Sequence, residues 1–270
     1  MRPTRHSPIG VFDSGVGGLT VLKALTERLP GEATVYLGDT ARVPYGTKSP
    51  DVVTRYSLKN AELLMEHGIK LLVVACNTAS SVAIPALQKA LPVPVIGVIG
   101  PGAAAAAKAT KTGRVGVIGT EGTIASGAYQ RALQEARADI VAVTQACPLF
   151  VPLAEEGWVE GDVPELVAQR YLAPLLAQGI DTLVLGCTHY PLLQKVIAHA
   201  AGPNVTLVDS AHATAERVEA LLQEEQLNDQ SATPEHTYLV TDVPGRFQQV
   251  GSRFLGRPIS AARQVDLRFG

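Results

Sequence analysis

The chain has 270 residues, of which 46% are apolar and 18% charged, so it can fill one large core or two modest ones and is not disordered. Lysine and arginine number 23 against 25 aspartates and glutamates, a net charge of −2, which argues against a nucleic-acid-binding surface and a polybasic membrane patch. Three cysteines are too few for a disulfide framework, and we expect them to be reduced thiols.

The segment that most resembles a membrane span is the uncharged run 90–107. Three prolines interrupt it and alanine supplies much of its apolar content, so the pattern argues against a spanning helix. Residues 1–8 are short and basic, but several glycines and Asp13 follow where a signal peptide has an apolar core. We therefore expect a soluble cytoplasmic protein with no membrane partner and no nucleic-acid substrate.

Short apolar runs alternate with helical stretches along the chain. Strands are predicted over residues 9–13, 34–37, 71–75, 93–99, 115–118, 140–144, 183–185 and 205–208. Helices are predicted over residues 19–28, 50–67, 80–90, 103–111, 123–138, 164–178, 191–201 and 211–226. Because most strands show little polar alternation, we expect them to be covered on both faces. The alternation predicts βαβ units and an α/β fold with mostly parallel sheets.

Two segments are candidate domain boundaries. Gly100-Pro101-Gly102 ends a strand-like run, and residues 209–211 follow the last strong strand. The polar stretch 223–234 is predicted to be a surface connection that leads to a weaker strand at 238–241. This organisation predicts two α/β lobes of roughly domain size, and the C-terminal tail is a candidate to return to the first lobe.

The sequence contains an internal repeat. Residues 71–78 (LLVVACNT) align with residues 182–189 (TLVLGCTH), so that an apolar strand leads in each case to a small residue, a cysteine and hydrogen-bonding side chains. Residues 9–14 match residues 115–120 in the same order and at nearly the same offset. Strand–loop–helix patterns recur in every α/β fold, but two pairs in the same order favour a duplicated, pseudo-symmetric lobe.

Cys76 and Cys187 each stand one residue beyond an apolar strand, where open α/β sheets bind ligands. A lone cysteine is commonly a small buried hydrophobe, and Cys147 fits that interpretation. Cys76 and Cys187 differ from Cys147. Each is followed by side chains that can donate a hydrogen bond to a thiolate or a carboxylate, and a predicted helix comes next. The N-terminus of a helix lowers the pKa of a thiol and attracts anions. The polar followers are Asn77, Thr78, Thr188 and His189.

If the lobes face each other about an approximate two-fold axis, one thiol approaches a bound molecule from each side. This arrangement suits removal of a proton from one face of a carbon and its return on the other face, which inverts a stereocentre. A thiol near its free pKa of about 8.5 can serve as base or acid. A zinc site would need clustered ligands, and a thiol protease would need no second, matched cysteine. A redox pair stays open as an alternative but leaves the polar flanks unexplained.

A glycine-rich segment, residues 13–20, ends the first strand and opens the first helix. It lacks the lysine of a P-loop and the glycine spacing of a dinucleotide-binding loop, so it gives little support to nucleotide binding. Asp13 is either an N-cap of the helix or a polar group of the site that contacts a substrate ammonium or assists a thiol.

Several long motifs resemble those of the bacterial glutamate racemases, which belong to the cofactor-independent aspartate/glutamate racemases. The resemblance extends over nearly the whole chain, and no motif position departs from it. The motifs that carry it are residues 10–18, 38–39, 43–46, 75–80, 116–120, 147–153 with 155–157, and 185–192.

The resemblance implies an isomerase that interconverts L- and D-glutamate and supplies the D-isomer for peptidoglycan, and hence for cell-wall biogenesis and cell shape. It implies that Cys187 acts on the L-enantiomer and Cys76 on the D-enantiomer, with Asp13 and His189 as assisting groups. Glu155 is the expected further assisting carboxylate, although its neighbour in the sequence, Glu156, stays an alternative.

The resemblance also implies the substrate contacts and the division into lobes. The implied substrate-contacting residues are Asp13, Ser14, Pro44, Tyr45, Gly46, Asn77, Thr78, Thr120, Thr188 and His189. The first lobe is expected to comprise residues 1–99 plus 211–270 and the second lobe residues 100–210, with the active site between them.

The chemistry of glutamate agrees with this prediction. Backbone N–H groups, threonine and serine hydroxyls and the Asn77 amide would bind its two carboxylates without an arginine. Because the α-proton is far less acidic than a thiol, the carbanion must be stabilised and water excluded, as closure of two lobes would do.

The sequence shows no cofactor motif and no metal-binding motif, so we expect a reaction that needs neither. We expect a small-molecule substrate, glutamate, and a homodimer whose interface the sequence does not identify. Two alternatives stay open: a racemase for aspartate or another amino acid, and a non-catalytic two-lobed protein that binds a dicarboxylate. Only the enzymes need two thiols.

Overall fold

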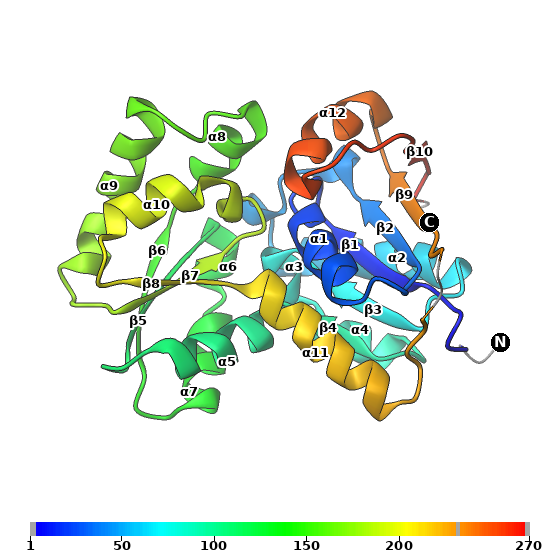
Figure 1. Cartoon of the computed structure of the whole chain (residues 1–270), viewed down its shortest axis with the longest axis horizontal. Helices are drawn as coiled ribbons and strands as arrows, with labels where there is room; N and C mark the ends of the chain where they lie inside the picture. The colour runs from blue at the N-terminus through cyan, green and yellow to red at the C-terminus, as the bar shows by residue number, and fades with distance from the viewer. Residues whose placement is uncertain (1–3, 231–232, 268–270) are drawn as a thin grey trace.

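The structure is a computed structural model that describes residues 4–230 and 233–267. Its strands form two separate sheets, and every strand pair within them is parallel (Figure 1). Helices cover both faces of each sheet, which explains why the central strands β1 (Ile9–Asp13), β3 (Leu71–Val74), β5 (Arg114–Gly119) and β7 (Thr182–Gly186) are largely apolar and almost fully buried. The predicted α/β class with two lobes is confirmed.

The larger sheet has six strands in the order β10-β9-β2-β1-β3-β4. These strands are β1 (Ile9–Asp13), β2 (Thr34–Gly38), β3 (Leu71–Val74), β4 (Val95–Gly97), β9 (His236–Val240) and β10 (Arg263–Gln264). The smaller sheet has four strands in the order β6-β5-β7-β8. These are β5 (Arg114–Gly119), β6 (Val141–Ala146), β7 (Thr182–Gly186) and β8 (Thr206–Asp209).

The two sheets repeat one topology. The order β2-β1-β3-β4 in the first sheet corresponds strand for strand to β6-β5-β7-β8 in the second, while β9 and β10 extend the first sheet at its β2 edge. In this correspondence β1 matches β5, and β3 matches β7. The two cysteine motifs therefore follow equivalent strands, as the internal repeat predicts.

Three helices cover each face of each sheet. In the first lobe, one face carries α1 (Leu19–Arg28), α11 (Ser210–Glu224) and α12 (Pro244–Leu255), and the other carries α2 (Pro50–Glu66), α3 (Asn77–Val82) and α4 (Ile84–Ala90). In the second lobe, one face carries α8 (Phe150–Glu156), α9 (Asp162–Leu176) and α10 (Gln194–Ala201), and the other carries α5 (Ile99–Ala109), α6 (Glu121–Ala125) and α7 (Ala128–Ala136). Three short 3-10 helices complete the list: η1 (Thr40–Arg42), η2 (Tyr45–Thr47) and η3 (Tyr190–Leu193).

Successive residues of the central strands enter different cores. In β1, Val11 packs in the cluster beneath α1, α11 and α12, whereas Phe12 packs in the cluster beneath α2 to α4. In β5, Val117 and Ile118 divide in the same way between the clusters on the two faces of the second sheet. This two-residue period follows from strand geometry and fixes which side chains face each helical layer.

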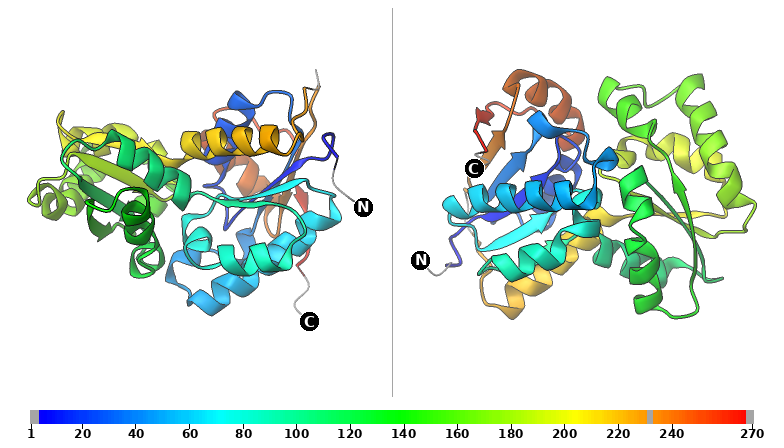
Figure 2. Two further views of the ribbon diagram at one scale, coloured as in Figure 1. Left: turned by 90° about the horizontal axis from the view of Figure 1, so that it is seen from below. Right: turned by 180° about the vertical axis from the view of Figure 1, so that it is seen from behind.

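The chain passes between the lobes at α5 and again at α11, which packs against both α1 and α5 (Figure 2). The Asp209 carboxylate caps α11 by accepting a hydrogen bond from the backbone N–H of Ala211 at 2.9 Å. Strand β9 then pairs with β2, so the C-terminal part of the chain lies in the first sheet. The division into residues 1–99 plus 211–270 and residues 100–210 stays a prediction.

The candidate boundary at Gly100, Pro101 and Gly102 lies inside a helix. These residues form the first turns of α5, the helix at which the chain passes between the lobes. Proline is tolerated there, since an N–H in the first turn has no partner within the helix. The strand predicted over residues 93–99 is accordingly shorter: β4 spans Val95–Gly97, and Ile99 already belongs to α5.

Other elements differ in length or number. The helix predicted over residues 80–90 is two helices, α3 and α4, that meet at Ala83. The helix predicted over residues 123–138 is α6 and α7, and Gly127 between them has a φ of +67°, which glycine adopts without strain. Helices α8 and α12 and strand β10 were not predicted. Residues 231–232 of the predicted surface connection lie outside the described residues.

Among the described residues, no helix has both the length and the apolar character that crossing a bilayer requires.

Candidate active site

Cys76 and Cys187 line the same cavity, which lies between the loops at the carboxyl ends of β1, β3, β5 and β7. Its volume is about 60 Å³. Of the predicted substrate-contacting residues, Ser14, Pro44, Tyr45, Gly46, Asn77, Thr78, Thr120, Thr188 and His189 line it, and so does Glu155. The structure therefore brings together residues from both lobes around the two thiols, which are both buried.

The Cys76 thiol is held at the start of α3. Its sulfur accepts a hydrogen bond from the backbone N–H of Ala79 at 3.4 Å and lies 3.7 Å from the Ser14 hydroxyl. The Asp13 carboxylate, which is fully buried behind the cavity, accepts a hydrogen bond from the Gly15 N–H at 2.9 Å. Burial raises the pKa of Asp13, although His189 and two backbone N–H groups oppose the shift.

Burial also has the largest effect on the pKa of the Cys76 thiol. It raises the pKa of Cys76 to about 12, and the charge of Asp13 adds to the rise, while the Ala79 N–H and Ser14 act in the opposite direction. The N–H at the start of α3 thus acts in the expected direction, but the loss of solvation is larger and sets the net direction of the pKa shift. At neutral pH, Cys76 is a protonated thiol that can donate a proton.

Cys187 stands in a different environment. Its sulfur lies 3.8 Å from Nδ1 of His189, and Nε2 of His189 lies 3.1 Å from Oε1 of Glu155. Burial lowers the pKa of His189, but the contacts with Cys187 and Glu155 outweigh this effect and raise it to about 10. The imidazolium in turn lowers the pKa of the Glu155 carboxyl. Cys187 therefore lies next to an imidazole that is held in turn by a carboxylate.

Glu155 is the carboxylate that contacts His189, and Glu156 points elsewhere. The Glu156 side chain is 65% exposed and lies 3.7 Å from Arg246. The two residues follow one another on α8, where successive side chains point in different directions. Of the two candidates, only Glu155 is placed to act through the imidazole.

The wall formed by residues 43–46 is fixed by a buried network. The Tyr45 hydroxyl donates to Oδ2 of Asp39 at 2.6 Å and accepts a hydrogen bond from the Asn60 amide at 3.0 Å. Asp39 is fully buried and also accepts hydrogen bonds from Arg42 and Thr241. This network orders the loop that places Pro44 and Gly46 on the cavity.

The floor of the cavity joins the two lobes through polar side chains. The Tyr129 hydroxyl of α7 donates to Oδ1 of Asn77 at 2.7 Å. The Nδ2 group of Asn77 is buried and has no hydrogen-bond partner in the structure. Because an unsatisfied buried donor is costly, this amide is suited to an anionic oxygen of a ligand in the cavity.

The glycine-rich loop after β1 packs directly against the second lobe. A Cβ atom at Gly17 would collide with the Thr188 hydroxyl and the His189 ring. The Thr188 hydroxyl donates to Oδ1 of Asp13 at 3.4 Å, and Thr20 donates to the carbonyl of Thr188 at 3.2 Å. Glycine is required here because the backbone closely approaches the second lobe.

Comparison with known proteins assigns the family. The profile described as Asp/Glu/Hydantoin racemase matches residues 9–218. The chain belongs to this family.

Its relatives include the glutamate racemase of Geobacter metallireducens, which is 58% identical over 260 residues that make up 96% of each chain. Among solved structures, glutamate racemase isoform RacE1 from Bacillus anthracis matches with a TM-score of 0.92 and 42% identity over 97% of this chain and 98% of that one. The glutamate racemase of Francisella tularensis, solved in complex with D-glutamate, matches with the same TM-score and 39% identity over the same shares. The resemblance to glutamate racemases drawn from the motifs is confirmed.

Some residues of this racemase site have no signal in the sequence. Tyr129, which orients Asn77, and Arg246, which faces Glu155, lie in helices outside the motifs. Val43 and Val151 line the cavity as plain apolar residues. Within residues 4–230 and 233–267, no group of three or more His, Cys, Asp or Glu side chains could hold a metal ion.

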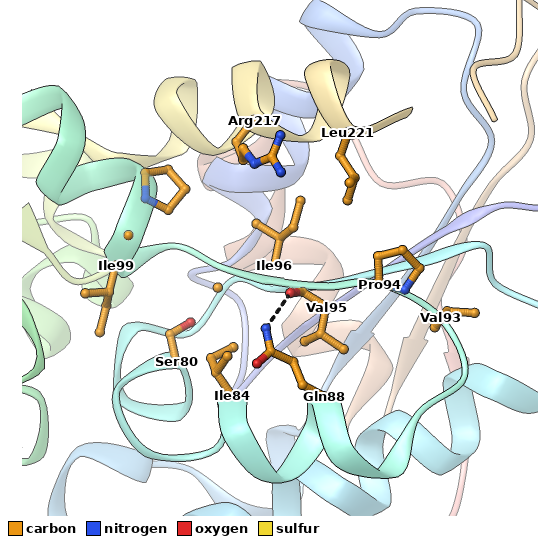
Figure 3. A pocket seen from close by; sticks show the side chains of 13 residues that line it. Ser80, Ile84, Gln88, Val93, Pro94, Val95, Ile96, Ile99, Arg217 and Leu221 are labelled. Carbon is orange, nitrogen blue, oxygen red and sulfur yellow. Dashed lines mark hydrogen bonds between the residues drawn. The ribbon is translucent and has the colours of Figure 1, made fainter. Parts of the chain in front are cut away.

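A larger cavity, of about 620 Å³, lies elsewhere in this racemase fold, along the outer edge of β4 (Figure 3). Ile84 and Gln88 of α4 line one side of it, and Arg217 and Leu221 of α11 the other. The Gln88 amide donates to the carbonyl of Val95 at 3.5 Å. Neither thiol lines this cavity, so its size does not make it the catalytic site.

Proposed function

We propose that the protein is a glutamate racemase, which interconverts L- and D-glutamate by proton transfer between the α-carbon and two thiols. The observation that carries this proposal is that Cys76 and Cys187 line one cavity and approach it from equivalent strands of two lobes with a repeated topology. The relatives named glutamate racemase, which match over nearly the full length, support the choice of substrate.

In the L-to-D direction, the Cys187 thiolate removes the α-hydrogen of L-glutamate as a proton. The electron pair stays on the α-carbon, and the Cys76 thiol gives its proton to the opposite face. The product is D-glutamate, with a thiol at Cys187 and a thiolate at Cys76. The charged His189 beside Cys187 and the raised pKa of the Cys76 thiol suit these starting protonation states.

The reverse reaction uses the same groups in exchanged roles. The Cys76 thiolate takes the α-proton of D-glutamate, supported by the Ala79 N–H and the Ser14 hydroxyl. A high pKa makes this thiolate a strong base, which helps because the α-proton of an amino acid is only weakly acidic. The Cys187 thiol then supplies the proton on the opposite face.

The substrate carboxylates bind to neutral donors. The buried Asn77 amide and the hydroxyls of Ser14, Thr78, Thr120 and Thr188 surround the cavity. Such donors are fixed in place by the protein and stabilise the negative charge that develops during proton removal. The product D-glutamate would serve peptidoglycan synthesis in the cytoplasm, and we propose that the enzyme acts as a homodimer.

Circular dichroism of L-glutamate incubated with the pure protein tests the function. The signal should decay to zero as the equimolar mixture of enantiomers forms, without any added cofactor, and α-deuterium should appear in D₂O. L-Aspartate and other amino acids tested in parallel reveal a different substrate. A folded protein that binds glutamate but leaves its dichroism and its α-hydrogen unchanged would be a binding protein and not a racemase.

A further inference from the structure

Helix α12 belongs to the first lobe, yet one face of it contacts the catalytic groups of the second lobe. Phe254 places its ring edge-on to the His189 ring, with 5.1 Å between the centroids and an angle of 77° between the planes. Arg246 and Arg253 are two helical turns apart and so lie on one side of α12, toward α8. In Figure 1, α8 and α12 face each other across the boundary between the two lobes.

The two oxygens of the Glu155 carboxylate have different partners. Oε1 lies 3.1 Å from Nε2 of His189, and Oε2 lies 3.8 Å from Nη2 of Arg246. The carboxylate thus stands between an imidazole of its own lobe and a guanidinium of the other lobe. Its charge and its orientation both depend on the position of α12.

Arg253 of α12 binds the backbone of α8. Its guanidinium donates to the carbonyl of Glu155 at 3.1 Å, near the C-terminal end of α8. Carbonyls in the last turn of a helix lack partners within the helix, and a cation there is favourable. Gly157, which ends α8, lies so close to Arg253 that a Cβ atom would come within 2.6 Å of the guanidinium.

Arg246 and the two thiols line different cavities, and Glu155 lines both. Glu155 lines both the catalytic cavity and an outer cavity of about 100 Å³, where Arg246 is found with Asp242, Val243 and Phe247. Arg246 does not line the catalytic cavity. The chain of polar contacts from Arg246 toward the Cys187 thiol runs through Glu155 and His189.

We propose that Arg246 is a positioning residue for the Cys187 half of the site, holding the Glu155 carboxylate against His189 only when the two lobes are in contact. This inference rests on the proposed racemase function. Closure of the lobes over a substrate then assembles the Glu155–His189–Cys187 chain, and opening the lobes releases it. The Cys76 half has no such dependence, because Ala79 and Ser14, its hydrogen-bond partners, belong to the same lobe as the thiol.

Steady-state kinetics of the full-length Arg246→Met variant test the proposal. Because the ion pair is partly exposed, we expect kcat to fall about two- to fivefold with little change in KM. Arg246→Lys should recover most of the loss. In the double variant with Glu155→Gln, removal of Arg246 should cost nothing more, since its only route to the thiol has been cut.

The pH dependence of kcat is a second test, because loss of a residue with a purely structural role would not shift it. The groups that contact the Glu155 carboxylate are His189 from the loop after β7 and Arg246 from α12. Two further charged groups lie nearby: Arg253, which donates to the Glu155 backbone carbonyl, and Glu156, which lies against Arg246. Arg246 contributes to lowering the pKa of Glu155, so its loss raises that pKa. The acidic limb of kcat should move to higher pH in Arg246→Met.

Arg257→Met is the matched control, because this exposed arginine follows the end of α12 and its removal changes the net charge equally. It should leave kcat and the pH profile unchanged. Unchanged kcat in Arg246→Met, or losses that multiply in the double variant, would overturn the proposal. A rise in KM alone, abolished by salt, would assign Arg246 to substrate attraction instead. A wild-type protein without racemase activity would refute the proposed function itself.

Discussion

The hydroxyl oxygens of Thr78 and Thr120 lie 2.9 Å apart, although Thr78 follows β3 of the first sheet and Thr120 follows β5 of the second. Thr123 completes the group, at 3.2 Å from Thr78 and 3.0 Å from Thr120. These contacts place the ends of two central strands from different lobes at one point. Both threonines line the catalytic cavity, so the loop after β3 and the loop after β5 form its wall together.

Removal of either active-site thiol should abolish racemisation but not all proton exchange. In Cys76→Ala, Cys187 can still remove and return a proton on one face, so L-glutamate should exchange its α-hydrogen with D₂O without inversion. Racemisation should fall by about 10²- to 10⁴-fold, the usual contribution of a general acid or base. Mass spectrometry and circular dichroism on the same sample separate the two processes.

Cys147→Ala is the control for both thiol variants. Cys147 is buried, its thiol donates to the backbone carbonyl of Gln145, and it does not line the catalytic cavity, so its loss should leave racemisation near the wild-type rate. Full racemase activity in Cys76→Ala or Cys187→Ala would contradict the two-thiol mechanism.

The Asn77 amide should act on substrate affinity. Its buried Nδ2 group has no hydrogen-bond partner among the residues that the structure describes, and a hydrogen bond to a charged ligand is worth about 1.5–3 kcal/mol. Asn77→Ala should therefore raise KM by roughly one to two powers of ten. Tyr129→Phe, which removes only the hydrogen bond that orients this amide, should give a smaller rise. Equal KM values for wild type and Asn77→Ala would exclude the contact.

The sequence predicted the elements with strong periodicity and failed where local signals conflict with packing. Helix α1 and strand β1 agree with their predicted bounds because the glycine-rich residues 14–18 separate an apolar strand from an amphipathic helix. Helix α12 was missed because Pro244 and Gly245 suggest a turn, whereas Val243, at a φ of +43°, directs the chain into a helix that packs on Tyr36 through Phe247. A helix held by such long-range contacts has no local signature.

The residues of the site likewise fall into those that the sequence predicts and those that it does not. Cys76, Cys187 and their polar neighbours are consecutive in sequence, so their motifs locate them. Arg246 enters the site only through the distant pairing of β9 with β2, which no local pattern encodes. The raised pKa of Cys76 also depends on burial by the whole fold, which the sequence around a helix N-terminus does not report.

The pH dependence of activity should reflect the His189–Glu155 pair. His189, with a pKa raised to about 10, stays protonated through neutral pH, so kcat/KM should fall as the pH rises through that value. The lowered pKa of Glu155 keeps its carboxylate ionised well into the acidic range. His189→Asn should lower kcat and remove the alkaline inflection near pH 10. An inflection that persists unchanged in this variant would assign it to another group.

The same pair should affect stability. Because the pKa of His189 rises from 6.5 to about 10 on folding, its stabilising contribution is complete below about pH 6.5 and is lost as the pH rises to about 10. The melting temperature of the wild type should therefore fall more steeply across this window than that of His189→Asn. Parallel curves would show that the imidazole is neutral in the folded protein.

A buried ion pair at the opposite end of the first sheet should contribute to stability alone. Lys70 and Glu32 are both buried with 2.5 Å between Nζ and Oε2, and Lys70 also donates to the carbonyls of Arg5 and Leu227. Lys70→Met should lower the free energy of unfolding by about 3–5 kcal/mol, because it leaves the Glu32 carboxylate buried without a counter-charge. In urea titrations, Glu32→Gln combined with Lys70→Met should be less destabilised than Lys70→Met alone.

Gly17→Ala tests whether close contact between the lobes is needed for catalysis. The added methyl group would meet the Thr188 hydroxyl and the His189 ring, so the loop or the second lobe must shift away from the thiols. Displacements of this size cost about 10²-fold in rate, and we expect kcat to fall accordingly while the fold persists. Gly100→Ala in α5 provides the control, since nothing lies within 4 Å of its added Cβ and alanine favours the helix by up to about 1 kcal/mol. Retained kcat in Gly17→Ala, measured beside a Gly100→Ala variant of wild-type activity, would show that the reaction tolerates separation of the loop from His189.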